Sequence, residues 1–422
     1  MRRRAERLLF AGAAALYGLW LYQVAIALRG VRMPAPPPPA STRRRFAVLV
    51  PAHNEERVIG HLLDSLAAQR YPPERFDLYV SCDACDDRTA VIAREKGAFV
   101  LERRARGTSG KTANLGWALD RIGIDRYDAI ALFDADNVVD PGFLASMNDF
   151  LEAHPDAGAV QGWLDVKNPD DSWVTRVYVL AFAYANRFWQ LARENAGLSV
   201  NLGGTGQVVR IDELRRHGWA WTSLTDDLEL TCHIVLAGGR VRYDPHAISY
   251  DEKPVSEPAS RAQRSRWLRG HYSALRRFGW PLLRRSVRAA DPRALDLALH
   301  LVVPGRAATS YATMFGGFAV LALRSALRPD WPRTDPRAPV WLGFGAAAVV
   351  QCALVLIVAP SLRRGRLTLR HLPDAGAYLW YGLRWIPSAI SLVRAGRDAV
   401  WSRTEHHRAL GLAQVERERR VR

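Results

Sequence analysis

Cysteine is scarce in this sequence, and its scarcity excludes a disulfide-based scaffold. Only Cys82, Cys85, Cys232 and Cys352 occur among 422 residues, too few to form a disulfide framework in a chain of this length. Cys82 and Cys85 have the spacing of a redox pair or of half a zinc site, but no second pair completes a metal site. We therefore interpret these two as small residues that close a strand.

Acidic residues are also in deficit. The chain has 42 Asp and Glu against 59 Lys and Arg, which gives a net charge of +17. Such an excess is typical of proteins that bind nucleic acid, an anionic membrane surface or a phosphorylated substrate. No zinc-finger spacing and no basic motif interleaved with aromatic residues is present, so we expect no nucleic-acid partner. The sequence is 49% hydrophobic and 24% charged, which excludes a disordered chain.

The N-terminal region predicts a membrane anchor followed by a linker. Residues 1–30 begin with arginines and then run apolar from Leu8 to Leu28, which is long enough to cross a bilayer. The run is longer than a signal-peptide core and no clear cleavage site follows it, so we expect a retained anchor, with a cleaved signal peptide as the alternative. Residues 31–45 are a proline-rich and basic linker whose arginines would meet anionic headgroups or water.

The region from 286 to 397 predicts further contact with a membrane. Apolar runs occur at Leu295–Leu323, Val340–Ala359 and Ala375–Val393. Val340–Ala359 has the length and composition of a membrane span, whereas the other two are interrupted by Pro and Arg, so the last of them could span or lie in the interface. The segments beside these runs are basic, as is the tail from 398 to 422, which favours the cytoplasmic side.

Strand and helix patterns alternate between the apolar ends, from residue 46 to about residue 162. Short apolar runs predict strands, and amphipathic patterns predict helices between them. The strands are expected at 46–50, 78–80, near 99–100, at 130–133 and at 157–163. This alternation predicts an α/β fold with a doubly wound, mostly parallel sheet and helices on both faces.

Acidic residues follow three of these predicted strands, namely Glu55, then Asp83 with Asp87, then Asp134 with Asp136. Ligands of open α/β sheets bind beyond the carboxyl ends of the strands, so these carboxylates are expected to share one edge. Two hard oxygen ligands such as Asp134 and Asp136 suit Mg²⁺ or Mn²⁺ held against a substrate phosphate. Caps on the following helices would explain each acid separately, but not this pair.

Two glycine-rich segments are further candidates for ligand contact. Gly110-Lys111-Thr112 has the last residues of a Walker A loop, but Gly107 is too close and the first strand does not precede it; Lys111 could still contact a phosphate. Residues 201–206 form a turn that could let the backbone approach a ligand, or be only a tight turn.

Three later segments carry helical or basic patterns. Residues 172–195 predict an aromatic amphipathic helix that lies in the core or at a membrane surface. Thr225 is a candidate cap for a helix that starts with Asp226 and Asp227, and these acids could simply complement the helix dipole. Residues 262–270 place several arginines around a tryptophan, which suits a diphosphate and a sugar ring, or a basic segment beside a membrane.

Five motifs in a fixed order resemble a known family. They are Pro51-Ala52-His53-Asn54-Glu55-Glu56, the pair Asp83 and Asp87, Asp134-Ala135-Asp136, Thr225-Asp226-Asp227, and Gln263-Arg264-Ser265-Arg266-Trp267. Together they resemble the membrane-integrated inverting glycosyltransferases of family 2, such as cellulose, chitin and hyaluronan synthases, and above all bacterial exopolysaccharide glycosyltransferases. The resemblance covers about residues 46–280 and the flanking membrane segments.

The resemblance implies a GT-A catalytic domain over residues 46–285 that uses a nucleotide-diphosphate sugar and Mg²⁺ or Mn²⁺. It implies that Asp227 is the catalytic base and that Asp136 ligates the metal, with Asp134 beside it. The family has Glu where Asp226 stands, so the shorter side chain is a departure. Donor-binding positions are Ala52, Asn54, Glu55, Asp83, Lys111, Asp134, Gln263 and Arg266. Acceptor-binding positions are Gly204, Asp226 and Trp267.

The activity implied by the resemblance is sugar transfer with inversion in bacterial extracellular polysaccharide synthesis. We expect a UDP-sugar as donor, and a growing polysaccharide or a lipid-linked molecule as acceptor. The protein would be a multi-pass protein of the inner membrane with a cytoplasmic catalytic domain, in contact with the bilayer and with other export proteins. Two alternatives are a transferase that adds one sugar to a polyprenyl or lipid acceptor, and a membrane-anchored nucleotide-sugar sensor without turnover.

Overall fold

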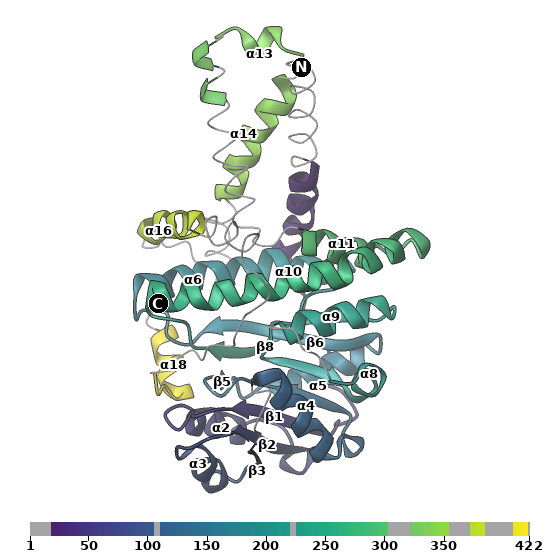
Figure 1. The fold of residues 1–422 in the computed structure, drawn as a ribbon, viewed down its shortest axis with the longest axis vertical. Coiled ribbons are helices and arrows are strands. Elements are labelled where there is room, and N and C mark those ends of the chain that lie inside the picture. The colour runs from purple at the N-terminus through teal and green to yellow at the C-terminus, as the bar shows by residue number, and fades with distance from the viewer. Residues whose placement is uncertain are drawn as a thin grey trace.

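A single eight-stranded sheet organises the chain (Figure 1). The computed structural model describes residues 18–104, 110–219, 225–302, 321–323, 325–327, 329–336, 338–353, 372–384 and 408–420. Residues 18–27 are helical, and the predicted linker from 33 to 45 contains neither helix nor strand.

The sheet is mixed in direction. Its strands are β1 (Phe46–Ala52), β2 (Phe76–Asp83), β3 (Phe99–Arg103), β4 (Ala129–Leu132), β5 (Val138–Val139), β6 (Ala157–Val166), β7 (Gln207–Arg210) and β8 (Arg240–Asp251). Their order is β3-β2-β1-β4-β7-β6-β8-β5. The first four strands are parallel, as is β6 with β8, whereas β7 is antiparallel to β4 and β6, and β5 to β8.

The prediction of a mostly parallel sheet is confirmed for β1 to β4 and for β6 with β8, whereas the antiparallel strands β5 and β7 were not predicted. It rested on long apolar runs separated by helices, which describe β1 to β4. Parallel neighbours need a crossover connection of a dozen residues or more. β5 and β7 are strands of two and four residues that lack such apolar runs, and both run opposite to their neighbours.

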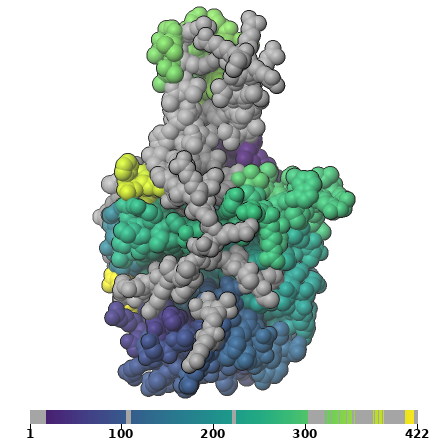
Figure 2. Space-filling view, viewed as in Figure 1, coloured from purple at the N-terminus to yellow at the C-terminus, as the bar shows by residue number. Residues whose placement is uncertain are grey.

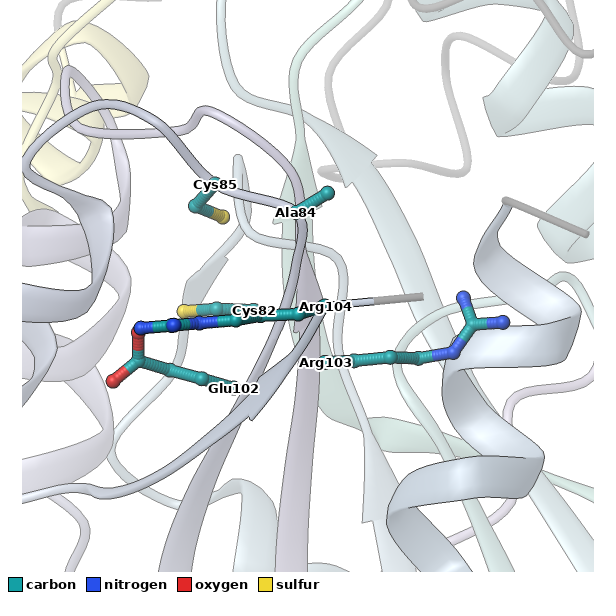
Figure 3. A pocket seen from close by; sticks show the side chains of 6 residues that line it. All are labelled: Cys82, Ala84, Cys85, Glu102, Arg103 and Arg104. Atoms are coloured by element: carbon teal, nitrogen blue, oxygen red, sulfur yellow. The ribbon is translucent and has the colours of Figure 1, made fainter. Parts of the chain in front are cut away.

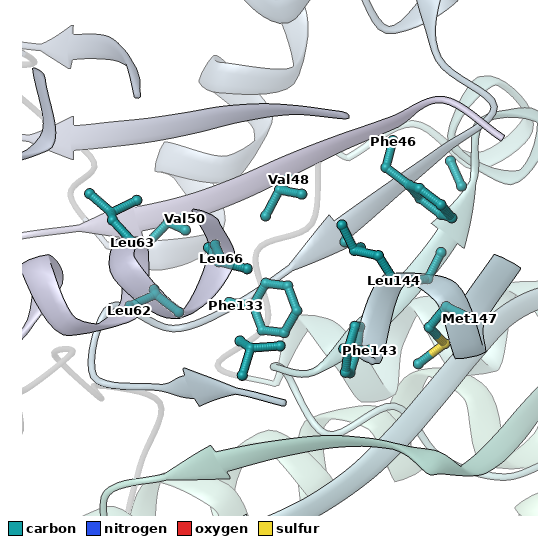
Figure 4. Packing of buried hydrophobic residues seen from close by; sticks show 14 of the residues in the cluster. Phe46, Val48, Val50, Leu62, Leu63, Leu66, Phe133, Phe143, Leu144 and Met147 are labelled. Carbon is teal, nitrogen blue, oxygen red and sulfur yellow. The ribbon is translucent and has the colours of Figure 1, made fainter. Parts of the chain in front are cut away.

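Helices cover both faces of the sheet, as predicted. One face carries α2 (Ile59–Ala67), α3 (Thr89–Glu95) and α5 (Phe143–Ala153); the other carries α4 (Lys111–Ile122), α8 (Ile211–His217) and α9 (Asp226–Leu236). Side chains alternate between faces along a strand. Phe46, Val48 and Val50 accordingly pack against α2 and α5 (Figure 4), whereas Ala47 and Leu49 pack against α4, α8 and α9. Short turns occur at η1 (Leu28–Val31), η2 (Pro73–Arg75) and η3 (Ile124–Arg126).

A layer of long helices lies beyond the sheet domain in Figure 1. Residues 173–195 are one helical run, α6 (Trp173–Tyr184), the π-helix η4 (Ala185–Leu191) and α7 (Ala192–Asn195). α10 (Glu257–Arg288) is 32 residues long and α11 (Pro292–Val302) packs on it; both project on one side in the space-filling view (Figure 2). α16 (Leu372–Leu383) joins α6 in a cluster that buries Val174, Val177 and Tyr381. These α6 residues therefore follow the core alternative of the sequence analysis.

The predicted membrane spans remain predictions. Within the ranges described, no helix combines the length and the apolar composition needed to cross a bilayer. Beyond α11, the chain includes α13 (Trp331–Thr334), α14 (Ala338–Ala353) and α18 (Leu412–Arg420). Much of the predicted anchor and spans, at 1–17, 303–320, 354–371 and 385–407, lies outside the described residues.

Candidate active site

The ends of β1 and β2 bring the first two predicted motifs together. Ala52 pairs in register with Cys82, so the turn from Ala52 to Glu55 lies beside Asp83. His53 Nδ1 is 2.5 Å from the carbonyl oxygen of Asp83. The Asn54 backbone N–H donates to Cys85 Sγ at 3.4 Å. The expectation that these strand ends share one edge is confirmed.

Asp83 is buried, with a cationic partner that sequence reasoning missed. Arg103 Nη1 donates to Asp83 Oδ1 at 2.8 Å, and the Gly110 N–H donates to Oδ2 at 3.3 Å. Beside this pair is a cavity of about 410 Å³ (Figure 3), where Arg103 points away from Arg104. The cavity is lined by Cys82, Ala84, Cys85, Glu102, Arg103 and Arg104.

Glu55 and Asp87 organise the loops around this edge. The Glu55 N–H donates to Thr89 Oγ1 at 2.7 Å. Asp87 accepts from the Thr89 N–H at 2.9 Å and from the Glu56 N–H at 3.1 Å. Asp87 thus accepts from the first backbone N–H of α3, although the N-cap position of that helix is Arg88.

Lys111 joins the glycine turn to the first aspartate of the β4 turn. Its Nζ donates to Asp134 Oδ1 and to the Gly204 carbonyl oxygen at 2.7 Å. Gly204 has φ +80°, and a Cβ there would lie 3.4 Å from Asp227 Oδ2. The glycine turn therefore lies directly against Lys111 and Asp227, which favours the functional alternative over a mere tight turn.

Carboxylates and cations crowd together at the start of α9. Burial acts to lower the pKa of Lys111, but Asp134, Asp226 and Asp227 together raise it to about 12. Burial lowers the pKa of Arg266, which faces the same three carboxylates. Desolvation and then the neighbouring Asp226 raise the pKa of Asp227 to about 7, although the Leu228 N–H donates to Asp227 Oδ1 at 2.8 Å.

A glycine lets α10 approach the start of α9. A Cβ on Gly270 would lie 2.4 Å from Thr225 Cγ2 and 2.5 Å from its Oγ1, so the helices pack this closely only because residue 270 lacks a side chain. Arg266 lies one helical turn earlier on α10. The close approach therefore brings Arg266 within electrostatic influence of Asp226 and Asp227, which act to raise its pKa against burial.

Gln263 and Trp267 lie on the same helix but contact the layer around α6. Gln263 Oε1 accepts from the Tyr178 hydroxyl at 3.2 Å. Trp267 packs, partly buried, against a cluster that contains Val166 and Val174. Their predicted roles toward the diphosphate and the acceptor stay predictions.

Asp134 and Asp136 are the two carboxylates that the sequence analysis predicts as metal ligands. Asp136 is 3% exposed, and Asn137 Nδ2 donates to its Oδ1 at 3.3 Å. Among the described residues, no three His, Cys, Asp or Glu side chains form a group that could hold an ion by themselves. Proteins usually bind Mg²⁺ through one or two carboxylates together with the phosphates of a substrate. The carboxylates of Asp134 and Asp136 therefore fit a cation that binds together with a diphosphate.

Three polar residues that the sequence analysis did not select hold this site together. Thr205 Oγ1 accepts from the Asp134 N–H at 2.9 Å. Gln161 Oε1 accepts from the Gly203 N–H at 2.7 Å. Lys167 Nζ donates to the Asp136 carbonyl oxygen at 2.6 Å. The only signal for Lys167 was a charged residue directly after a buried strand.

The site residues described above lie within a single family match. Residues 43–270, more than half of the chain, match the family described as Glycosyltransferase like family 2. The chain belongs to this family. The match ends where Arg266 and Gly270 lie against the start of α9, so it covers the aspartate, glycine and arginine motifs described above.

Curated relatives match a little more than half of this chain. The probable glycosyltransferase YdaM of Bacillus subtilis is 29% identical over 243 residues, 56% of this chain and 57% of that protein. The beta-monoglucosyldiacylglycerol synthase of Trichormus variabilis is 29% identical over 266 residues, 61% of this chain and 54% of that protein. The chain thus matches little more than half the length of these relatives.

Solved structures show the same fold. The mannosyltransferase PcManGT from Pyrobaculum calidifontis, solved in complex with GDP-Man and Mn²⁺, has a TM-score of 0.50 and 24% identity, covering 81% of this chain and 98% of that one. At this identity the likeness establishes the fold alone, which is α/β and GT-A-like.

Proposed function

We propose that this family 2 protein is an inverting glycosyltransferase that moves a sugar from a nucleotide-diphosphate sugar to the hydroxyl of a glycan or lipid-linked acceptor. The observation that carries the proposal is the position of Asp227. Its Oδ2 lies so close to Gly204 that a Cβ at residue 204 would be 3.4 Å away. Asp227 also influences the pKa values of Lys111 and Arg266, so the three groups form one electrostatic cluster. A carboxyl group with a pKa of about 7 suits a general base at neutral pH.

The proposed reaction is a direct displacement. Asp227 accepts the proton of the acceptor hydroxyl while that oxygen forms a bond to the anomeric carbon. The bond between the anomeric carbon and the diphosphate oxygen breaks, and the diphosphate leaves with the electron pair. Attack opposite the leaving group inverts the anomeric centre. Arg266 and Lys111 stabilise the charge that develops on the diphosphate.

Asp136 and Asp134 would hold Mg²⁺ or Mn²⁺, whose positive charge assists departure of the diphosphate when it is bound. Support comes from the oxygen-rich turn itself and from the Mn²⁺ in the PcManGT complex. The turn from Ala52 to Glu55 and the buried Asp83 would hold the nucleoside, for which uridine is our proposal.

The acceptor would approach along Gly204 and Asp226, with Trp267 nearby on α10. The chemistry at Asp227 is the same for a sugar hydroxyl and a lipid hydroxyl, and one relative is a glucosyldiacylglycerol synthase. We propose that the reaction occurs at the cytoplasmic side of the inner membrane, because apolar runs with basic flanks surround the catalytic region in the sequence.

The test is a donor screen with the full chain. UDP- and GDP-sugars are supplied with Mn²⁺ or Mg²⁺ and an acceptor panel of oligosaccharides and lipids, and release of nucleoside diphosphate is measured. Asp227→Asn should keep donor affinity but lose transfer by about 10²–10⁴-fold, the usual effect of removing a general base. The anomeric configuration of the product is read by NMR, and its length by mass spectrometry.

Asp120→Asn is the matched control. Asp120 is an exposed aspartate near the far end of α4 from Lys111, so its loss should leave turnover unchanged. Turnover by Asp227→Asn near the control rate would refute the assignment of the base. Donor binding without transfer to any acceptor would support the sensor alternative instead.

A further inference from the structure

The C-terminal segment, residues 408–420, packs against β5, which directly follows the Asp136 turn, and against its neighbour β8. α18 lies beside β5 and β8 in Figure 1. Leu410 and Val415 are buried in one cluster with Val138 and Tyr250, which are paired residues of β5 and β8. This segment lies far along the chain from the turn and outside the family match.

Arg408 anchors the start of this segment. Its Nε lies 2.9 Å from both carboxylate oxygens of Asp171, and its backbone N–H donates to Glu252 Oε1 at 3.2 Å. Glu252 is only 7% exposed. A buried carboxylate needs such partners, because removing a charge from water without compensation is costly.

Lys167 connects Glu252 to the metal-binding turn. Its Nζ is 3.2 Å from Glu252 Oε2 and donates to the Asp136 carbonyl oxygen at 2.6 Å. The Lys167 side chain is 1% exposed, so its ammonium depends on these partners. The contacts therefore run from Arg408 through Glu252 and Lys167 to the backbone of Asp136.

We propose that Lys167 is a positioning residue for the cation and the diphosphate, and that the C-terminal segment completes its support through Glu252. This inference rests on the proposed function, since it assigns Asp136 to the metal. Lys167 binds the carbonyl oxygen of Asp136, so it holds the backbone of the residue whose carboxylate would bind the cation. With its backbone held, that carboxylate loses less freedom when it binds.

The test measures metal-dependent nucleotide binding by the full chain rather than turnover. Calorimetry with UDP in MnCl₂ should show binding to Lys167→Met weakened by roughly 10-fold or more, as for other groups that orient metal ligands. Val415→Asp should also weaken the affinity for UDP, because a carboxylate at this buried position would prevent the C-terminal segment from packing on its apolar contacts. Lys167→Arg, which keeps the charge, should recover part of the loss.

Two further measurements separate positioning from folding. With EDTA in place of MnCl₂, UDP should bind the wild type and Lys167→Met equally, which a general loss of structure would not produce. Arg417→Ala is the matched control, because Arg417 is exposed on α18 and should not change affinity. If Val415→Asp fails to fold, Arg408→Ala removes the Asp171 pair and is read in the same way.

The outcomes distinguish this inference from the proposed function. If the wild type binds UDP with Mn²⁺ and both Lys167→Met and the C-terminal variants bind it equally well, the inference is overturned and the proposed function stands. If the wild type binds no nucleoside diphosphate with either cation across the donor screen, both are overturned.

Discussion

At the scale of single residues, the pKa values in the site depend on the balance between its carboxylates and its cations. Asp134, Asp226 and Asp227 gather around two cations, Lys111 and Arg266. Three carboxylates against two cations leave an acidic excess that a bound cation would offset. The resemblance predicts Glu at the position of Asp226, and the contribution of Asp226 to the pKa of Asp227 can be measured.

The pH profile of transfer should report that contribution. As the proposed base, Asp227 would act in its ionised form, and its pKa is raised to about 7, so kcat/KM should rise as the pH increases through about 7 and level off above it. Asp226→Asn removes a negative charge beside Asp227, so the midpoint of the kcat/KM profile should fall by about one pH unit. Asp226→Glu keeps the charge and should keep the midpoint. An identical midpoint in Asp226→Asn would contradict this electrostatic account.

At the scale of elements, the packing of α10 on the start of α9 brings the arginine motif to the base. Gly270 makes this possible, because any side chain there would overlap that of Thr225. Gly279, on the same helix, would meet only the tip of the Leu275 side chain, at 3.0 Å. Of these two glycines of α10, only Gly270 is needed for the close packing on α9.

Gly270→Ala should push α10 away from α9 and carry Arg266 with it. We expect a loss of about 1–3 kcal/mol in stability, typical of overpacking, and a higher KM for the donor. Gly279→Ala should be neutral or stabilising, because alanine favours a helix. In a double-mutant cycle, Thr225→Gly should recover part of the loss. Additive effects would mean that the contact does not position Arg266.

Among the strands, some could be predicted from the sequence and others could not. β1 to β4 were predicted because each is an apolar run bounded by turn residues and helical patterns. β8 was missed because Pro245 interrupts it; proline enters sheets mainly at bulges. The register with β6 indeed shifts there, from Gly162 opposite Asp244 to Trp163 opposite Ile248.

Site residues divide in the same way. Asp134 and Asp136 could be found locally, because they follow a buried strand. Lys167 and Arg103 act through contacts with residues 31 and 20 positions away, which no local pattern encodes. The roles of Asp227 and Arg266 came from the family resemblance, because nothing in the sequence alone shows that α10 meets α9.

At the scale of the whole molecule, the helix at residues 18–27 is fastened to the catalytic region by a buried ion pair. Arg193 and Asp296 meet at 2.7 Å with side chains 1% and 3% exposed. Tyr22 donates to Asp296 Oδ1 at 2.9 Å, and Arg193 Nη2 donates to Gln23 Oε1 at 3.3 Å. This network joins the N-terminal helix, α7 and α11.

Breaking this pair should destabilise the whole chain. Asp296→Ala leaves the Arg193 charge buried, and such a loss costs about 3–5 kcal/mol. Arg215→Ala removes an ion pair with Asp125 whose side chains are 50% and 78% exposed, and should cost no more than about 1 kcal/mol. Denaturant unfolding compares the two variants. Equal stability losses would show that the buried pair is not what fastens the helix.

The docking of α18 on β5 and β8 also has a consequence for the order in which the protein is made. The ribosome synthesises the Asp136 turn well before Leu410 and Val415. At about 5–20 residues per second, the interval is on the order of tens of seconds. A nascent chain therefore carries its aspartates and Lys167 through this interval without the contacts from Arg408 and α18. These contacts form only once residues 408–420 have been synthesised.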